Sequence, residues 1–265
     1  MGLLTLTSRI VGKKFDDAAR AHAPKLDRAD TGLPFNAQIG ALLEVPRTDF
    51  AVLDGSLLDV PKSAQLPIVA VSRIHLDADD DLAVFRLYTD TGHDRGGDGA
   101  SFLQVVCRAG NLADVQDIGF YQHLCREFPV TDEEQAPFRG EGFGLGESDY
   151  FMEADLLSTM PQAAGRVPEI LAGGTAIQFV RDTAGGTYVK PFEGGENRLD
   201  DAVGEKGMHK RISFMPYARS LAGGQTERLL ISFDYVKTVD GSRNPAAYVD
   251  YWAGLPLDLN KVKVL

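Results

Sequence analysis

The sequence is poor in cysteine and contains no long apolar run. Cys107 and Cys125 are its two cysteines, which is too few for a disulfide framework, and their spacing is not that of a CxxC motif. This usage favours a reducing cytoplasm, while a single Cys107–Cys125 disulfide stays open. No stretch of 18 consecutive apolar residues occurs, so we expect no transmembrane helix. The segment 1–14 places its basic pair after its apolar residues and has no long hydrophobic region, so we expect no secretory signal.

Catalytic motifs are also missing. The sequence contains no G-x-S-x-G, no H-E-x-x-H and no G-x-x-x-x-G-K-[ST]. Gly142–Gly146 resembles a nucleotide loop superficially, but Glu141 and Glu147 flank it and no helix start follows, so phosphate binding is disfavoured. We expect His123 and Cys125 to face opposite sides of the chain, which disfavours a Cys–His dyad. We therefore assign no catalytic, cofactor-binding or metal-binding residue.

Positive charge is in short supply. Lys and Arg number 27 against 38 Asp and Glu, and the net charge is -11. This balance argues against a nucleic acid or an anionic membrane surface as a partner, because like charges repel. A cationic ligand, a metal ion or a basic protein remains compatible with it.

Two acidic clusters contain residue types that can bind a metal ion. Asp90, Asp94 and Asp98 lie four residues apart with His93 between them, and a second cluster spans residues 75–81. A hard cation needs several oxygens that converge on one point, and the spacing does not match the D-x-D-x-D-G pattern. We interpret the first cluster as a solvated hairpin tip and the second as a turn that keeps a sheet edge soluble.

The sequence is rich in strand-like runs. Residues 82–88 and 101–107 are dense in Val, Phe, Leu and Tyr and flank a loop rich in Gly and Asp, which predicts a β-hairpin. Both faces of each run are largely apolar, so the hairpin should be central, with Phe85 and Val105 buried. Residues 117–128 fit either a strand or a helix, and the run Thr131–Glu134 predicts a short capped helix that Pro137 stops.

Strand-like runs recur along the rest of the chain, and helical periodicity is nearly absent. This texture predicts a β-dominated α+β fold of mostly antiparallel sheets. The interpretation of domains is a leader or short helix in 1–32, a first β lobe in 33–140 and a second in 141–265, with a single domain as the alternative. Near the C-terminus an aromatic cluster would either close the core or line a groove: Tyr235, Tyr248, Tyr251 and Trp252.

Three segments together resemble a known family. The runs 33–44, 85–91 leading into 101–106, and 227–232 are similar to those of the bacterial YjfK-like family of unknown function. The resemblance spans about residues 33–258, and this chain departs from it in a longer loop at 92–100 and a Gly-rich insertion around 185–207. In that family the genes lie beside those for PspA-like membrane-stress proteins and integral membrane proteins. The resemblance implies a cytoplasmic accessory protein and supplies no catalytic residues.

Two functional hypotheses follow. The leading one is a non-catalytic binding or assembly module of a membrane-stress system, with a PspA-like or integral membrane protein as partner and no direct contact with nucleic acid or lipid. The alternative is a hydrolase-type or metal-assisted enzyme that uses carboxylates of residues 75–98. An exposed apolar or aromatic patch would favour the module, and ionisable groups converging in a pocket would favour the enzyme.

Overall fold

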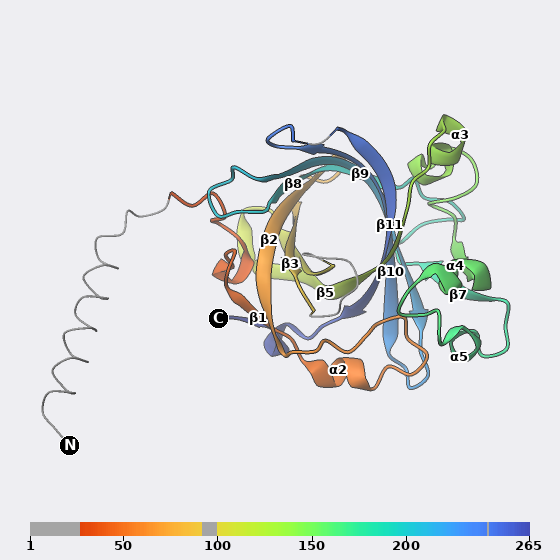
Figure 1. Cartoon of the computed structure of the whole chain (residues 1–265). Coiled ribbons are helices and arrows are strands. Elements are labelled where there is room, and N and C mark those ends of the chain that lie inside the picture. Colours follow the sequence, from red (N-terminus) through yellow and green to blue (C-terminus); the bar gives the residue numbers. More distant parts are fainter. Residues whose placement is uncertain (1–26, 92–99, 243) are drawn as a thin grey trace, which may run out of the picture.

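Eight antiparallel strands close into a barrel in the computed structural model, which describes residues 27–91, 100–242 and 244–265 (Figure 1). Around the barrel each strand pairs with the next in the order β2-β3-β4-β5-β11-β10-β9-β8, and β8 pairs back onto β2. The barrel strands are β2 (Gln65–Leu76), β3 (Leu82–Thr89), β4 (Ser101–Arg108), β5 (Asn111–Glu127), β8 (Phe192–Leu199), β9 (Gly207–Ser220), β10 (Thr226–Thr238) and β11 (Ala246–Pro256).

The prediction of a β-dominated, antiparallel fold is confirmed, but one barrel stands where two β lobes were expected. Strands β2–β5 come from the first half of the chain and β8–β11 from the second, and the two sets meet at the β5–β11 and β2–β8 pairings. Four strands alone would leave two edges with unpaired backbone groups. Closure pairs each of these edges with a strand from the other half.

The predicted central hairpin is confirmed as β3 and β4. Phe85 pairs with Val105, and their side chains are 4% and 0% exposed. At the end of the hairpin next to its loop, the hydroxyls of Thr89 and Ser101 lie 2.7 Å apart. The loop residues His93, Asp94 and Asp98 lie outside the described residues. Residues 1–26 of the expected N-terminal leader or short helix also lie outside them.

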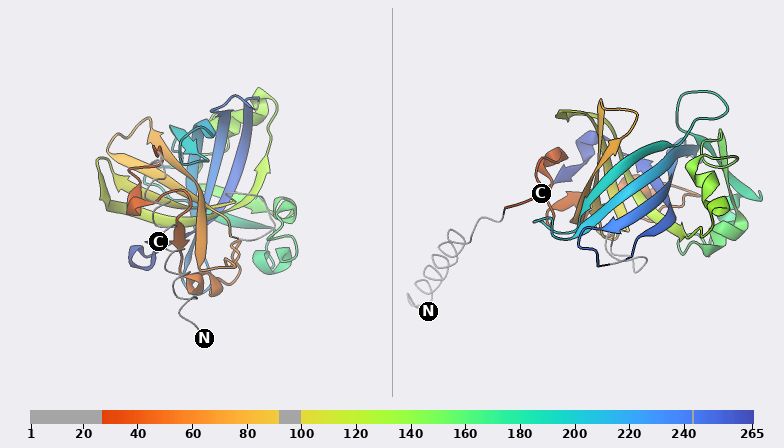
Figure 2. Two further views of the ribbon diagram at one scale, coloured as in Figure 1. Left: turned by 60° about the vertical axis from the view of Figure 1, so that its left-hand side comes forward. Right: turned by 90° about the horizontal axis from the view of Figure 1, so that it is seen from above.

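Short elements extend the barrel wall and cover its outside. Strands β1 (Leu42–Glu44) and β12 (Lys263–Val264) continue the sheet beyond one end of β2, and β7 (Ala176–Arg181) and β6 (Asp149–Glu153) continue it from β9. The helices lie outside the barrel in each view (Figures 1 and 2). They are η1 (Pro34–Asn36), α2 (Arg47–Ala51), α3 (Asp132–Gln135), η2 (Ala136–Arg139), α4 (Ala154–Thr159), α5 (Val167–Leu171) and η3 (Leu259–Lys261).

The two faces of the barrel wall have different cores. The outer face is packed beneath the short elements; the ring of Phe50 in α2, for example, meets that of Phe120 edge-on at 5.5 Å. The inner face carries an aromatic cluster in which Phe102 contacts both Tyr121 and Trp252. Gly254 makes room for it, because a Cβ there would lie 2.5 Å from the Tyr121 ring.

The segment that follows β5 has the predicted cap. Thr131 accepts a hydrogen bond from the backbone N–H of Glu134, whose carboxylate accepts one from the N–H of Thr131. This reciprocal capping box starts α3. The α-helix ends at Gln135, and Pro137 lies in the 3₁₀ turn η2 that follows. Residues 117–128, whose sequence fits either a strand or a helix, belong to strand β5 up to Glu127.

Candidate functional site

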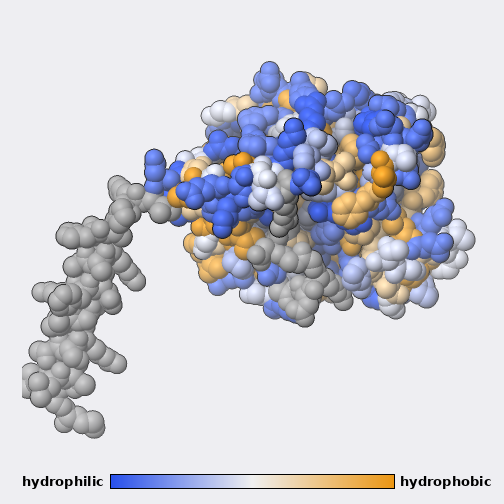
Figure 3. All heavy atoms as spheres, turned by 45° about the horizontal axis from the view of Figure 1, so that its top comes forward, coloured by the Kyte–Doolittle hydropathy of each residue, from blue (hydrophilic) through white to orange (hydrophobic). Residues whose placement is uncertain are grey.

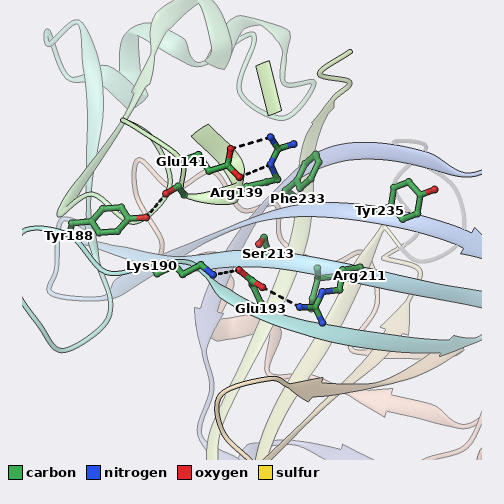
Figure 4. Close-up of a pocket in the computed structure, with 11 residues that line it drawn as sticks. Arg139, Glu141, Tyr188, Lys190, Glu193, Arg211, Ser213, Phe233 and Tyr235 are labelled. Carbon is green, nitrogen blue, oxygen red and sulfur yellow. Dashed lines mark hydrogen bonds and ion pairs between the residues drawn. The ribbon is translucent and has the colours of Figure 1, made fainter. Parts of the chain in front are cut away.

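A groove of about 540 Å³ lies on the outside of the barrel, between η2 with its following turn and strands β8–β10 (Figure 4). One wall comes from the turn after η2, the other from β8 and β9, and Phe233 and Ser213 lie between them. The lining residues are Arg139, Gly140, Glu141, Tyr188, Lys190, Glu193, Arg211, Ile212, Ser213, Phe233 and Tyr235.

Close glycine contacts hold the turn wall in position. The hydroxyl of Tyr188 donates to the carbonyl oxygen of Gly140 at 2.7 Å, and a Cβ on Gly140 would lie 2.4 Å from Pro191. Gly146 accepts a hydrogen bond from the N–H of Val189 at 2.9 Å. Its φ of +103° lies in the region that glycine favours, and a Cβ there would lie 2.2 Å from the carbonyl oxygen of Val189.

Arg181 connects the loop 183–187 to the turn that contains Gly146. Its guanidinium donates to the carbonyl oxygens of Gly146, Thr187, Gly185 and Gly186, and its Nε donates to the hydroxyl of Thr183 at 3.0 Å. The planar fork of an arginine is suited to several simultaneous acceptors. One side chain thus fixes the loop that leads to Tyr188 against the turn that contains Gly146.

Two rows of ion pairs face each other across the groove (Figure 4). On the turn wall Arg139 contacts Glu141 at 3.2 Å. On the barrel wall Glu193 joins Lys190 at 2.5 Å to Arg211 at 3.1 Å. These pairs are partly or largely exposed, and such pairs contribute only about 0–1 kcal/mol each. The ion pairs therefore hold the charged side chains in position, but breaking one of these pairs costs little free energy.

The ion pairs set the protonation of the carboxylates in and next to the groove. The hydrogen bond from Lys190 lowers the pKa of Glu193, and that from Arg139 lowers the pKa of Glu141. Arg211, which also pairs with Asp77 outside the groove, lowers the pKa of that carboxyl by hydrogen bonding. All three carboxylates are consequently ionised at neutral pH.

Aromatic side chains supply the apolar part of the groove. Phe233 is 8% exposed and belongs to the outer core, whereas Tyr235 and Tyr188 are 44% and 41% exposed. Tyr and Phe side chains offer large contact area at a small entropic cost when they are held by a sheet. The groove therefore combines charged edges with a partly apolar floor.

A second cluster of ionisable groups fills the barrel interior. Glu196 is fully buried; it accepts hydrogen bonds from Ser72 and Tyr88, both at 2.6 Å, and lies 3.3 Å from Arg86 and 3.5 Å from Lys210. Burial raises the pKa of Glu196, but the charges of Lys210 and Arg86 and the two hydrogen bonds outweigh burial and lower it to about 2. This network has its charges matched inside the barrel, so we regard it as part of the core.

The carboxylates of residues 75–81 do not converge. Asp77 pairs with the exposed Arg211, and Asp79 accepts a hydrogen bond from the backbone N–H of Asp81. Among the described residues no group of three His, Cys, Asp or Glu side chains could hold a metal ion. Asp90 is described, while Asp94, Asp98 and His93 are not.

His123 and Cys125, the candidates for a Cys–His dyad, both lie on β5 next to β11. The ring of His123 hydrogen-bonds Asp250 at 3.0 Å, and His123 pairs with Trp252 while Cys125 pairs with Tyr251. His123 lies against Trp252 of the inner core, whereas Cys125 packs against the outer core. A regular strand would place residues two apart on the same face. The opposite orientation arises from the β-bulge at Tyr251/Trp252, which leaves Leu124 as the extra residue. Both cysteines are free, and burial raises the pKa of Cys125 to about 12, which leaves this thiol unreactive at neutral pH.

The C-terminal aromatic cluster divides between core and groove. Trp252 lies in the inner core and Tyr251 in the outer core, where its hydroxyl lies 3.1 Å from that of Tyr150. Tyr248 stacks on the Arg126 guanidinium at 3.6 Å. Tyr235 alone of these four residues lines the groove.

Sequence reasoning missed most of the groove. Arg139, Lys190, Glu193, Arg211 and Phe233 were not singled out. The glycines of 142–146 suggest only a phosphate loop, whereas the turn that precedes them supplies a groove wall. The available signal was the pair Phe233 and Tyr235, which lie two residues apart on one face of β10. Such a pair is equally common in a strand that covers a core.

The fold and site define a closed antiparallel β-barrel with an external groove of paired charges and aromatic side chains. A family model described as "Protein of unknown function (DUF2491)" matches residues 8–263, nearly the whole chain, and the protein belongs to this family. No curated protein and no solved structure matches the chain. Within the described residues, every helix is too short or too polar to cross a membrane.

Proposed function

We propose that the protein is a non-catalytic binding module whose external groove holds an extended segment of a protein partner. The observation that carries this proposal is the pair of ion-pair rows on either side of an aromatic floor (Figure 4). Apolar side chains of a bound segment would pack on Phe233 and Tyr235, and its charged or backbone groups would meet the two rows.

The charges of the groove suit such a ligand. Three cations, Arg139, Lys190 and Arg211, and two carboxylates, Glu141 and Glu193, line it, in a chain whose net charge is -11. Since exposed ion pairs are weak, an acidic or amide group of the ligand can replace a carboxylate as partner of an arginine at little cost.

The partner that we propose is a protein of a bacterial membrane-stress assembly, either PspA-like or integral to the membrane. The resemblance to the YjfK-like family supports this assignment. We further propose that the protein acts in the cytoplasm, which its two free thiols support. In this function it makes no direct contact with lipid or nucleic acid, because its net negative charge opposes both.

Affinity purification of the tagged full chain from its native host tests the proposal. The wild type should recover a PspA-like or integral membrane protein, and Arg211→Glu and Tyr235→Ala should recover several-fold less. Arg108→Ala is the matched control, since it breaks an equally exposed pair, Arg108–Asp114, on the β4–β5 hairpin.

Urea denaturation of each variant would show that folding is intact, because Arg211 and Tyr235 are both well exposed. Equal recovery by all four proteins would contradict the assignment of the groove. Failure of the wild type to recover any such partner would contradict the assignment to a membrane-stress assembly.

A further inference from the structure

A phenylalanine projects into solvent from the loop that continues the groove wall. Phe143 is 85% exposed, the most of any large hydrophobic residue in the described part of the chain. Gly142 and Gly144 flank it, and the next residue, Leu145, is 1% exposed and anchored in the outer core. Exposed apolar side chains occur elsewhere on the surface among hydrophilic ones (Figure 3), but Phe143 stands at the tip of a defined loop.

The backbone on both sides of Phe143 is held in place. The N–H of Glu141 donates to the carbonyl oxygen of Ala136 at 2.9 Å, and that of Leu145 to the carbonyl oxygen of Pro137 at 3.0 Å. The N–H of Gly146 donates to the hydroxyl of Tyr217 at 3.1 Å. A side chain presented on a constrained backbone loses less entropy when it is bound than one on a flexible loop.

Close packing adds to this constraint. A Cβ on Gly144 would lie 2.6 Å from the Cβ of Pro137, so the loop is pressed against η2. The φ of Gly142 is +84°, a conformation that residues other than glycine rarely adopt. The local sequence therefore builds a fixed support for an apolar side chain that contacts nothing in its own core.

The surroundings of Phe143 are acidic. Segment 131–147 contains five carboxylates, Asp132, Glu133, Glu134, Glu141 and Glu147, against one cation, Arg139. The Asp132 and Glu141 side chains are 93% and 62% exposed. An apolar anchor in an acidic segment is complementary to an apolar pocket with a basic rim.

We propose that Phe143 is the anchor of a protein–protein interface and inserts into an apolar pocket rimmed by Lys and Arg on a protein partner. This contact goes beyond the groove, since it is made by the protein's own side chain in a pocket of the other molecule. Gly140 and Glu141 belong to both the groove wall and the base of this loop, so one partner can engage both. The carboxylates disfavour an anionic lipid surface, and they disfavour a second copy of the same acidic loop.

Site-specific photo-crosslinking in the native host tests this proposal. The full chain is produced with Phe143→p-benzoylphenylalanine, irradiated in cells, and the adducts are mapped by mass spectrometry. The expected result is a protein adduct whose crosslinked peptide carries Lys or Arg within a few residues of an apolar attachment point. Val52→p-benzoylphenylalanine is the matched control, because Val52 is 60% exposed at the end of α2 and should yield no such adduct.

Other crosslinking results would overturn the proposal. A lipid adduct would assign the loop to a membrane surface, and an adduct of twice the chain mass would assign it to self-association. An adduct with a peptide that lacks basic residues, or the absence of any adduct specific to position 143, would also refute the proposal.

Binding of the mapped partner by purified variants separates this proposal from that of the groove. Phe143→Ala should weaken binding at least tenfold and Phe143→Leu less, because leucine keeps part of the apolar contact. If Phe143→Ala weakens binding while Arg211→Glu does not, the anchor stands and the groove assignment fails. If Phe143→Ala leaves the affinity unchanged, the anchor is refuted whatever Arg211→Glu does.

Discussion

At the scale of single residues, the stability of the fold depends on buried charges that have partners. Arg86 and Glu196 are 2% and 0% exposed and form an ion pair between β3 and β8. The Arg86 guanidinium also lies over the Phe102 ring at 4.7 Å, and its Nη2 has no hydrogen-bond partner. A buried pair with matched charges is tolerated, but one whose partner is removed leaves an uncompensated charge.

Glu196→Gln should therefore lower the free energy of unfolding by about 3–5 kcal/mol, the range for a buried pair that loses one partner. The glutamine keeps the shape of the side chain but leaves Arg86 and Lys210 facing a neutral group. Urea denaturation at pH 7 measures the change. Glu193→Gln, on the same strand but in the exposed groove, is the control and should change stability by less than about 1 kcal/mol. Equal effects of the two changes would refute the role of the network.

The same carboxylate predicts a dependence of stability on pH. The pKa of Glu196 is lowered to about 2 in the folded protein, from 4.5 in its ordinary environment. A lowered folded pKa adds stability that is complete above the unfolded pKa and is lost as the pH falls towards 2. The difference in stability between the wild type and Glu196→Gln should thus be constant from pH 7 to about 5.5 and narrow below pH 4.5. Thermal or urea unfolding over this range tests it, and a constant gap down to pH 3 would contradict the assignment.

At the scale of elements, glycines decide where loops can go. Gly146 and Gly142 both have positive φ, of +103° and +84°, but their surroundings differ. A Cβ on Gly146 would lie 2.2 Å from the carbonyl oxygen of Val189, whereas that on Gly142 would meet open space. Position 146 thus requires glycine because of both close packing and its positive φ, whereas position 142 requires it only because of its positive φ.

Gly142→Ala should accordingly cost about 1–2 kcal/mol of stability, the strain of a left-handed conformation. Gly146→Ala should cost that amount and a further 1–3 kcal/mol for overpacking, and it should displace the groove wall near Tyr188. Chemical denaturation gives both values. Equal losses would show that the contact with Val189 relaxes freely and does not shape the groove.

The tip of the β3–β4 hairpin carries a prediction about metals. Asp90, Asp94 and Asp98 do not have the spacing that brings carboxylate oxygens together around calcium. Calorimetric titration of the protein with calcium, magnesium and manganese should give no saturable heat. Micromolar binding that Asp94→Ala abolishes would overturn this expectation and would favour an enzyme over a binding module.

The whole molecule combines a closed barrel with a strong negative charge. Closure leaves no long exposed edge in the barrel, and the added strands β6 and β12 that end the sheet are short, which limits edge-to-edge association. The net charge of -11 acts over the entire surface. In our proposal, contacts with other molecules are made by two local surfaces, the groove and the Phe143 loop.

This charge predicts the response to membranes. The purified chain should not co-sediment with phosphatidylglycerol liposomes at ordinary salt, because anionic headgroups and the protein repel each other within a Debye length of about 8–10 Å. Neutral phosphatidylcholine liposomes serve as the comparison. Strong binding to the anionic liposomes alone would contradict the exclusion of direct lipid contact.

The sequence by itself determined the features that depend on near neighbours. The dense β-branched and aromatic residues of 82–88 and 101–107 placed a buried hairpin correctly, because such residues favour strands and Gly and Asp favour the turn between them. The capping box at Thr131 was readable for the same reason, since its partners are three residues apart. The predominance of antiparallel strands followed from many such local signals.

Tertiary structure alone decided the barrel and the groove. The partner of β5 is β11 and that of β2 is β8, and no local periodicity specifies which of several similar strands will pair. Arg86 and Glu196 are 110 residues apart in sequence, and the groove draws on η2, β8, β9 and β10. Tyr235 was recognised as a groove candidate from its residue type, but the arginines and lysine around it could not be distinguished from ordinary surface charges. The barrel and the groove depend on pairing between strands that are distant in sequence. The closed barrel fixes this pairing because each of its strands then has a hydrogen-bonded neighbour on both sides.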